Sequence, residues 1–152
     1  MADGEKAIEF LKARFRDAVA DAGECRGQHW ALLRRESLEA VCRRLRDDPE
    51  TAFDLLLDVT AVHWPEAGEP FELVYHLYSI SRNDRLRLKV RLRDGEPVPT
   101  LSGVWASADW NERETFDMFG IEFDGHPDLR RILMPDDYTD FPLRKDLPLY
   151  RG

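Results

Sequence analysis

The chain has 152 residues, a formal net charge of −8 and a hydrophobic content of 43%. This length and composition fit one globular domain with its own core, and the negative charge excludes a general nucleic-acid binder, which needs a basic surface. Two cysteines, Cys25 and Cys42, are too few for a disulfide framework or for the four ligands of an iron–sulfur cluster or a structural zinc ion. We expect both to be ordinary reduced thiols.

The sequence shows no targeting or membrane-spanning signal. The opening MADGEKAIEF has no basic segment followed by an apolar run, so we expect no signal peptide. No window approaches eighteen consecutive apolar residues, the length that a membrane-spanning helix needs. A role at a membrane would therefore require a partner protein that holds the chain there.

Two amphipathic helices are predicted in the first third of the chain. Between Glu5 and Asp21 the apolar residues fall at i, i+3, i+7 and i+11, which places them on one face of a helix. A short strand is expected from His29 to Leu33. Ser37 then offers a hydroxyl that can cap a second helix, and Pro49 ends that helix.

The hydrophobic pattern changes to a period of two in the middle of the chain. From Phe53 to Val62 the odd-numbered residues, including Leu55 and Leu57, are predicted to share one face of a strand. The segment from Phe71 to Ile80 is apolar on nearly both faces, which is typical of a central strand. From Arg85 to Arg93 basic and apolar residues alternate strictly. The short links between these segments favour an antiparallel meander.

The last third predicts a helix followed by a segment without regular structure. Ser107 or Asp109 can cap a helix over residues 108–119, and Gly120 ends it. Beyond it, prolines forbid a long helix, while the apolar residues between them need a surface to cover them. The fold class is therefore α+β: N-terminal helices on a mostly antiparallel sheet of three or four strands. We expect a domain over residues 1–120 and an extended, partner-binding tail over residues 121–152.

Few residues suggest chemistry. The acidic and histidine side chains near His126 are irregularly spaced and lie among arginines that can neutralise them, so a metal site is not favoured. Glu112 and Glu114 lie two apart and face different directions on a helix, which argues against an acid–base pair. The basic residues from Arg85 to Arg93 are typical of the solvated face of a sheet. Docking of this face onto an acidic patch of a partner is the alternative.

The C-terminal third carries a resemblance to a known family. Glu112-Arg113-Glu114, Asp117-Met118-Phe119 and the following GHPDLRRILMPDDY and PLRKDLPL resemble the signature of one subunit of proton-translocating NADH:quinone oxidoreductase. This is the thirty-kilodalton subunit of respiratory complex I. The upstream segments DLLLDVTAVHWPE and FELVYHLYSISRNDRLRLKVRL are also similar to that family. The resemblance covers roughly residues 30–149.

The resemblance implies a non-catalytic structural subunit of the hydrophilic arm. It implies that this chain holds no cofactor, since FMN and the iron–sulfur clusters belong to partner subunits. The C-terminal segment would run across the forty-nine-kilodalton subunit, beside the quinone site. The complex transfers electrons from NADH to quinone, coupled to proton translocation. The chain would be peripheral, on the cytoplasmic side of the bacterial inner membrane, with membrane contact only through the complex and no nucleic-acid partner.

The resemblance also singles out residues for partner contact and structural pairing. They are Glu112, Arg113, Glu114, Asp117, His126, Arg130, Arg131, Asp136, Arg144 and Lys145. Leu147 departs from the family pattern, in which a tyrosine is expected. Two alternatives stay open: the homologous subunit of a membrane-bound nickel–iron hydrogenase or related dehydrogenase, and a stand-alone small metal-dependent enzyme.

Overall fold

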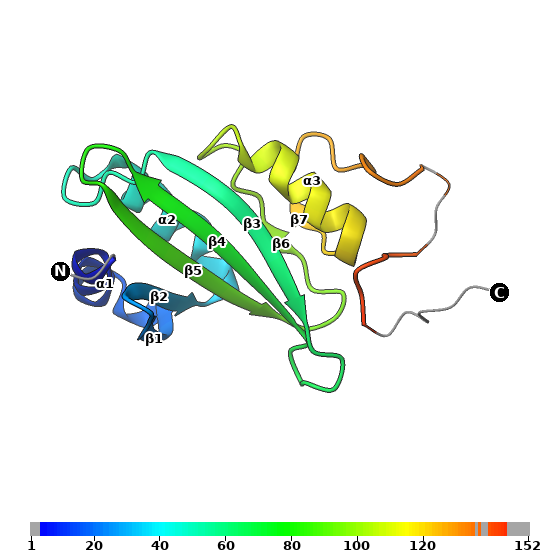
Figure 1. The fold of residues 1–152 in the computed structure, drawn as a ribbon, viewed down its shortest axis with the longest axis horizontal. Coiled ribbons are helices and arrows are strands. Elements are labelled where there is room, and N and C mark those ends of the chain that lie inside the picture. Colours follow the sequence, from blue (N-terminus) through cyan, green and yellow to red (C-terminus); the bar gives the residue numbers. More distant parts are fainter. Residues whose placement is uncertain (1–3, 136, 138–139, 146–152) are drawn as a thin grey trace.

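Three long strands with alternating apolar residues form the centre of a five-stranded sheet (Figure 1). They are β3 (Leu55–His63), β4 (Phe71–Ser79) and β5 (Asp84–Leu92), and they pair antiparallel as the predicted meander requires. The structure is a computed structural model that describes residues 4–135, 137 and 140–145. The α+β fold class predicted from the sequence is confirmed, with one strand more than expected.

The additional strands come from an N-terminal hairpin. β1 (Val19–Cys25) and β2 (Gln28–Leu33) pair antiparallel through a turn at Arg26 and Gly27, whose positive φ angles of 53° and 79° suit a tight hairpin. β2 then pairs parallel with β5, so the strand order is β1-β2-β5-β4-β3. One parallel pair therefore joins the hairpin to the otherwise antiparallel sheet.

The first helix is shorter than the sequence predicted. α1 (Glu5–Arg14) ends at Phe15, and a 3₁₀ turn, η1 (Arg16–Ala18), leads into β1. The predicted extension of the helix to Asp21 is wrong, because residues from Val19 onward pair with β2 instead. The apolar spacing of a helix stripe does not reveal this competing long-range pairing.

The second helix packs its apolar stripe against the sheet. η2 (Arg35–Ser37) leads into α2 (Leu38–Asp47), which passes behind β4 and β5 in Figure 1. Its buried residues are those that the sequence predicted: Leu38, Val41, Cys42 and Leu45. The predicted cap at Ser37 makes no side-chain hydrogen bond, although the residue does occupy the N-cap position.

The edge strand β3 contains an irregularity that the sequence did not reveal. Its pairing with β4 shifts register between Leu56 and Asp58, so Leu56 and Val59 face the core. Leu55 and Leu57 remain 38% and 50% exposed. The prediction that they share the buried face was wrong, because the bulge inverts the alternation around them.

The third helix covers the free edge of β3. α3 (Ala108–Phe119) contacts β3, and the chain leading into it bonds to unpaired strand carbonyls: Trp105 Nε1 donates to Phe53 O at 3.0 Å and Ser107 Oγ to Leu56 O at 2.8 Å. α3 ends at Gly120 with φ 77°, as predicted. On either side of it, β6 (Val98–Pro99) pairs parallel with β7 (Phe123–Asp124). Among the residues that the structure describes, no helix combines the length and apolar character needed to cross a bilayer.

Candidate functional site at the junction of helix and tail

The signature residues converge where α3 meets the segment from His126 to Lys145, which we call the α3–tail junction. Two carboxylates of α3, Glu112 and Asp117, are fully buried there. A buried carboxylate is destabilising unless hydrogen bonds or a cation compensate it. The partners of these two groups therefore define what the junction does.

Asp117 is compensated by the tail. Its Oδ1 accepts a hydrogen bond from Arg131 Nη1 at 2.8 Å. Its Oδ2 accepts from the backbone N–H groups of Leu133 at 2.7 Å, Met134 at 2.9 Å and Ile132 at 3.4 Å. Burial raises the pKa of Asp117, but Arg131 and these N–H groups outweigh burial and hold the pKa below its ordinary value. The ionised carboxylate thus fixes the tail backbone on the helix.

Arg144 forms a second anchor of the tail. Its Nε donates to Phe119 O at 2.6 Å, and its Nη2 lies 3.1 Å from Asp94 Oδ1. The guanidinium also lies 4.9 Å from the ring centroid of Phe71. Next to it, the backbone N–H of Lys145 donates to His63 Nδ1 at 3.0 Å. The described end of the tail is therefore held by the C-terminus of α3, by the β5–β6 link and by the end of β3.

Phe141 packs between these two anchors. Its ring lies 4.7 Å from the Arg131 guanidinium and 6.1 Å from the Phe116 ring, edge-on. The ring also rests on Gly120, where a Cβ atom would approach it to 2.7 Å. Glycine is thus required at position 120 by its positive φ and by the close approach of Phe141.

Glu112 is compensated differently, by neutral donors of the core. Its Oε1 accepts from the Thr100 hydroxyl, and its Oε2 accepts from the Leu101 backbone N–H at 2.7 Å. Burial raises the pKa of Glu112 to about 7, although both hydrogen bonds oppose this rise. Tyr75 and Cys42 are buried nearby, and burial followed by the Glu112 charge raises the pKa of each. This part of the site is a buried polar cluster inside the core.

Arg113 and Glu114 lie on the outer side of the same helix. The Arg113 guanidinium lies 5.6 Å from the exposed Trp110 ring, and its buried Nε has no acceptor among the described residues. Glu114 is exposed. The helical pairs of Arg113 with Asp109 and Asp117 that the spacing suggests are not formed. Asp109 instead pairs with His126, and Asp117 pairs with Arg131.

The remaining signature residues divide between buried and exposed positions. His126 Nε2 lies 3.2 Å from Asp109 Oδ1, and His126 Nδ1 accepts from the backbone N–H of Asp128 at 3.0 Å. Arg130 pairs with Asp128 at the surface, with 68% of its side chain exposed. Asp136 lies outside the described residues. Over residues 4–135, 137 and 140–145, no group of three or more His, Cys, Asp or Glu side chains can hold a metal ion.

Sequence reasoning missed several residues that complete the junction. Phe141, Asp94 and His63 hold the tail, and Thr100 with the Leu101 backbone holds Glu112. The αL glycine at the end of a helix is the signal that favours a close approach by another side chain at position 120. Asp94 and His63 carry no such signal, since both lie far from the tail in the sequence.

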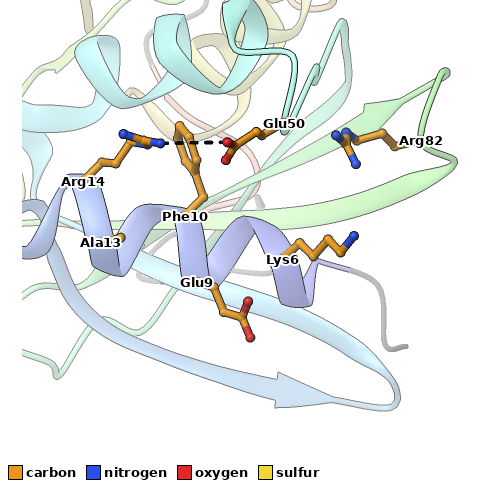
Figure 2. Close-up of a pocket in the computed structure, with 7 residues that line it drawn as sticks. All are labelled: Lys6, Glu9, Phe10, Ala13, Arg14, Glu50 and Arg82. Atoms are coloured by element: carbon orange, nitrogen blue, oxygen red, sulfur yellow. Dashed lines mark ion pairs between the residues drawn. The ribbon is translucent and has the colours of Figure 1, made fainter.

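A separate pocket of about 390 Å³ lies beside α1 (Figure 2). Phe10 is at its base, with the Arg14 guanidinium 5.0 Å from the ring centroid and directed towards Glu50 at 4.0 Å. Lys6 and Arg82 lie on the other side of Phe10, while Glu9 points away. The lining residues include no histidine, cysteine or hydroxyl group, so the pocket lacks the side chains of a nucleophilic or acid–base site.

Comparison of sequences places this geometry in a known context. Residues 31–151 match the family model described as "Respiratory-chain NADH dehydrogenase, 30 Kd subunit". The chain is 43% identical over 150 residues to the C-type subunit of NADH-quinone oxidoreductase from Geotalea uraniireducens, covering 98% of this chain and 90% of that protein. It is 46% identical over 148 residues to the same subunit from a Roseiflexus species, covering 97% and 85%.

Two solved structures share the fold. The first is described as a trypsin-resistant fragment (1-134) of Nqo5; it has a TM-score of 0.69 and 26% identity, and the match covers 82% of this chain and 99% of the fragment. The second belongs to an archaeal membrane-bound sulfane sulfur reductase, a respiratory membrane complex. That match has a TM-score of 0.77 and 29% identity and covers 95% of this chain and 87% of the other.

Proposed function

Because the chain belongs to the family of the 30-kDa subunit of respiratory-chain NADH dehydrogenase, we propose that it is the non-catalytic thirty-kilodalton subunit of an NADH-quinone oxidoreductase. It is a peripheral subunit on the cytoplasmic side of a bacterial membrane. Its partners hold FMN and the iron–sulfur clusters that carry electrons from NADH to quinone, coupled to proton translocation. The chain itself supplies structure to this assembly.

One observation carries the structural role: the tail has an anchored side and an exposed apolar side. Arg131 and Arg144 face the domain, where they bond to Asp117, Phe119 and Asp94. Leu133 and Leu143 point elsewhere and are 55% and 54% exposed. Leaving such side chains in water forgoes roughly 1.5–3 kcal/mol each relative to burial.

Trp110 of α3 extends this exposed apolar set. Its side chain is 55% exposed and lies beside Arg113, so an aromatic and a cation are available together. Tryptophan and arginine are among the residue types that contribute most to protein interfaces. We therefore assign Trp110, Arg113, Leu133 and Leu143 to the contact with the forty-nine-kilodalton subunit.

The host complex is the finer part of the proposal. The identities of 43% and 46% to NADH-quinone oxidoreductase subunits exceed the 29% to the sulfane sulfur reductase subunit, which favours NADH and quinone as the substrates of the complex. The TM-score of 0.77 keeps a related membrane-bound complex as the second candidate, in line with the hydrogenase alternative. No described pocket favours a stand-alone metal-dependent enzyme.

Purification of the tagged chain from host membranes tests the host complex. The proposal expects co-purification of NADH-binding and quinone-site subunits together with NADH:quinone oxidoreductase activity. Recovery with a nickel-containing large subunit, or with sulfur reductase activity and without NADH oxidation, would overturn it. The same preparation yields the FMN and iron content of each subunit, which tests the assignment of cofactors to the partners.

A pair of surface variants tests the contact with the forty-nine-kilodalton subunit. Leu133→Asp combined with Leu143→Asp should leave the free energy of unfolding unchanged but strongly reduce recovery of that partner with the tagged chain. Ile80→Asp is the matched control, because Ile80 is 60% exposed but lies in the β4–β5 turn. Equal recovery of the partner with the variant and the control would show that it binds elsewhere.

Truncation tests the division into a domain and a tail. Ile121 and Phe123 are buried in the core, so a deletion that removes only the tail begins after Asp128. We expect residues 1–128 to fold and to fail to assemble with the forty-nine-kilodalton subunit. An unfolded truncated chain would make the tail part of the domain core. Normal assembly would move the main contact to the sheet or the helices.

A further inference from the structure

The sheet has an outer face that no described helix covers. α2 packs on the opposite side, where Leu86, Leu88 and Val90 of β5 are buried (Figure 1). The outward side chains of β5 are all basic: Arg85, Arg87, Lys89, Arg91 and Arg93. With Trp30 and Leu32 of the neighbouring β2 they form what we call the basic face. These five cations are gathered on one strand of a chain whose net charge is −8.

Some of these cations are held in place by internal contacts. Glu72 is buried on the adjacent strand, and its carboxylate lies 3.7 Å from Lys89 Nζ and 3.2 Å from Arg91 Nε. Lys89 Nζ also lies 4.6 Å from the centroid of the Trp30 ring. Groups fixed in this way lose little conformational freedom when a ligand binds, which favours recognition.

Arg87 offers an unused hydrogen-bond donor in the middle of this face. It lies opposite His76 of β4, and its buried Nε has no acceptor among the described residues. Both residues line a pocket of about 60 Å³, which also borders the exposed Leu57. A buried donor without an acceptor costs about 1–3 kcal/mol, and a carboxylate entering the pocket would remove that cost. The pocket volume corresponds to about two water molecules, which is enough for a carboxylate group.

The basic face continues into two open grooves at the end of β5. One groove, of about 430 Å³, runs past Leu32 and Arg35, and the other, of about 690 Å³, runs past Trp64. Both grooves are lined by Arg91 and Arg93, so they form one surface. Trp64 is 44% exposed there. The surface therefore combines guanidinium groups with exposed aromatic and aliphatic side chains.

We propose that the basic face docks an acidic segment of a partner protein, with one carboxylate of that segment accepting a hydrogen bond from Arg87. Arginine matches carboxylates through a planar pair of donors, and four of the five cations are arginines. The interleaved Trp30, Leu32 and Trp64 favour a protein over a lipid surface or a nucleic acid, because interface cores combine aromatic residues with arginine. The face lies on β2, β4 and β5, so the proposal does not depend on the contact that the tail makes.

Charge-removing variants of the full chain test the docking in solution. Arg87→Gln with Arg93→Gln removes two charges and leaves Lys89 and Arg91 to compensate Glu72. Lys12→Gln with Arg16→Gln is the matched control, since both residues are exposed near the end of α1 and the charge change is the same. The probe is a fluorescein-labelled oligoglutamate peptide. We expect the face variant to bind it about tenfold more weakly and the control to change less than about twofold.

Two further arms identify the class of partner. Phosphatidylglycerol vesicles and a single-stranded oligonucleotide are titrated against the same variants, and a thermal melt confirms that all variants fold. A photo-crosslinking benzoylphenylalanine at position 93, in the complex assembled in host membranes, should react with an acidic segment of another subunit. Equal peptide affinity of the two variants, selective loss of vesicle or oligonucleotide binding, or crosslinks to lipid alone would each overturn the proposal.

Discussion

Glu112 and Asp117 lie on the same helix and are equally buried, yet the two halves of α3 treat them in opposite ways. In the first half, Glu112 accepts hydrogen bonds from Thr100 and Leu101, and its pKa is raised to about 7. In the second half, Asp117 meets Arg131 and three backbone N–H groups, and its pKa is lowered. The number and charge of the donors, rather than burial, separate the two carboxylates.

The difference assigns different roles to the two halves of the helix. The first half belongs to the core of the domain, where Glu112 closes a polar cluster with the segment before α3. The second half binds the tail through a charge pair and through hydrogen bonds that require an ionised carboxylate. Attachment of the tail therefore depends on charge, whereas the core around Glu112 is most stable with that group protonated.

The largest effect is expected at Asp117. Asp117→Asn keeps the size of the side chain but leaves the nearly buried Arg131 without its counter-charge, which should lower the free energy of unfolding by about 3–5 kcal/mol. Urea unfolding of the full chain measures this change. Glu114→Gln, on the exposed side of the same helix, is the control and should change stability by less than about 0.5 kcal/mol.

A double variant separates the charge pair from other effects of the substitution. Asp117→Asn with Arg131→Met removes both charges, so it should cost less than the sum of the single variants. Additive losses would mean that Asp117 and Arg131 stabilise the junction independently, and that the charge pair does not distinguish the second half of α3 from the first.

The second effect is a pH dependence of opposite sign for the two halves. The Glu112 carboxyl titrates near 4.5 when unfolded and near 7 when folded, so between these values the unfolded state loses its proton first. Stability should therefore fall as the pH rises through this window, by roughly 3 kcal/mol in total. Glu112→Gln should remove the fall, as measured by urea unfolding at several pH values. The lowered pKa of Asp117 contributes stability that is lost instead as the pH falls through that pKa. An unchanged slope in Glu112→Gln would rule out this origin.

A smaller effect is expected at the end of α3. Gly120→Ala places a methyl group 2.7 Å from Phe141 at a φ of 77°, and should cost about 1–2 kcal/mol. Gly95→Ala is the matched control, because φ is 85° there and no atom lies within 4 Å of the added Cβ. Faster trypsin cleavage of the tail in Gly120→Ala, but not in Gly95→Ala, would show that Phe141 has been displaced. Equal costs and equal cleavage would mean that only the backbone conformation matters.

The smallest effect is expected at Arg130. Its pair with Asp128 is exposed on both sides, so Arg130→Gln should change the free energy of unfolding by less than about 0.5 kcal/mol. Arg131→Gln, one residue further, should cost several times more. A loss above about 1 kcal/mol for Arg130→Gln would show that surface charge near the tail matters beyond the Asp117 pair.

The sequence predicted those parts of the fold that depend on local patterns. The strands near 71–80 and 85–93, the stripe of α2 and the glycine end of α3 all follow from hydrophobic period and capping. The end of α1 and the N-terminal hairpin did not, because β2 pairs with a strand far along the chain. The bulge in β3 also left no local signal, since apolar residues occupy both faces there.

The candidate site was predictable in kind but not in detail. The mixture of acidic residues on α3 and arginines in the tail indicated pairing, and Asp117 does pair with a tail arginine. The choice of Arg131 over its neighbour Arg130 depends on which side of the extended chain faces the helix, and a chain without a regular period does not encode this in its pattern. Glu112 and Thr100 were not linked by any spacing, because their contact depends on the path of the chain before α3.

The parallel pairing of β2 with β5 has a consequence for the order of folding. The N-terminal hairpin leaves the ribosome first, but its partner strand is made only after α2, β3 and β4. Until Leu92 has emerged, β2 keeps an unpaired edge and the hairpin cannot join the sheet. We expect the last step of folding to be the docking of this early segment onto a late one, a non-local closure that slows folding and leaves an edge open to aggregation.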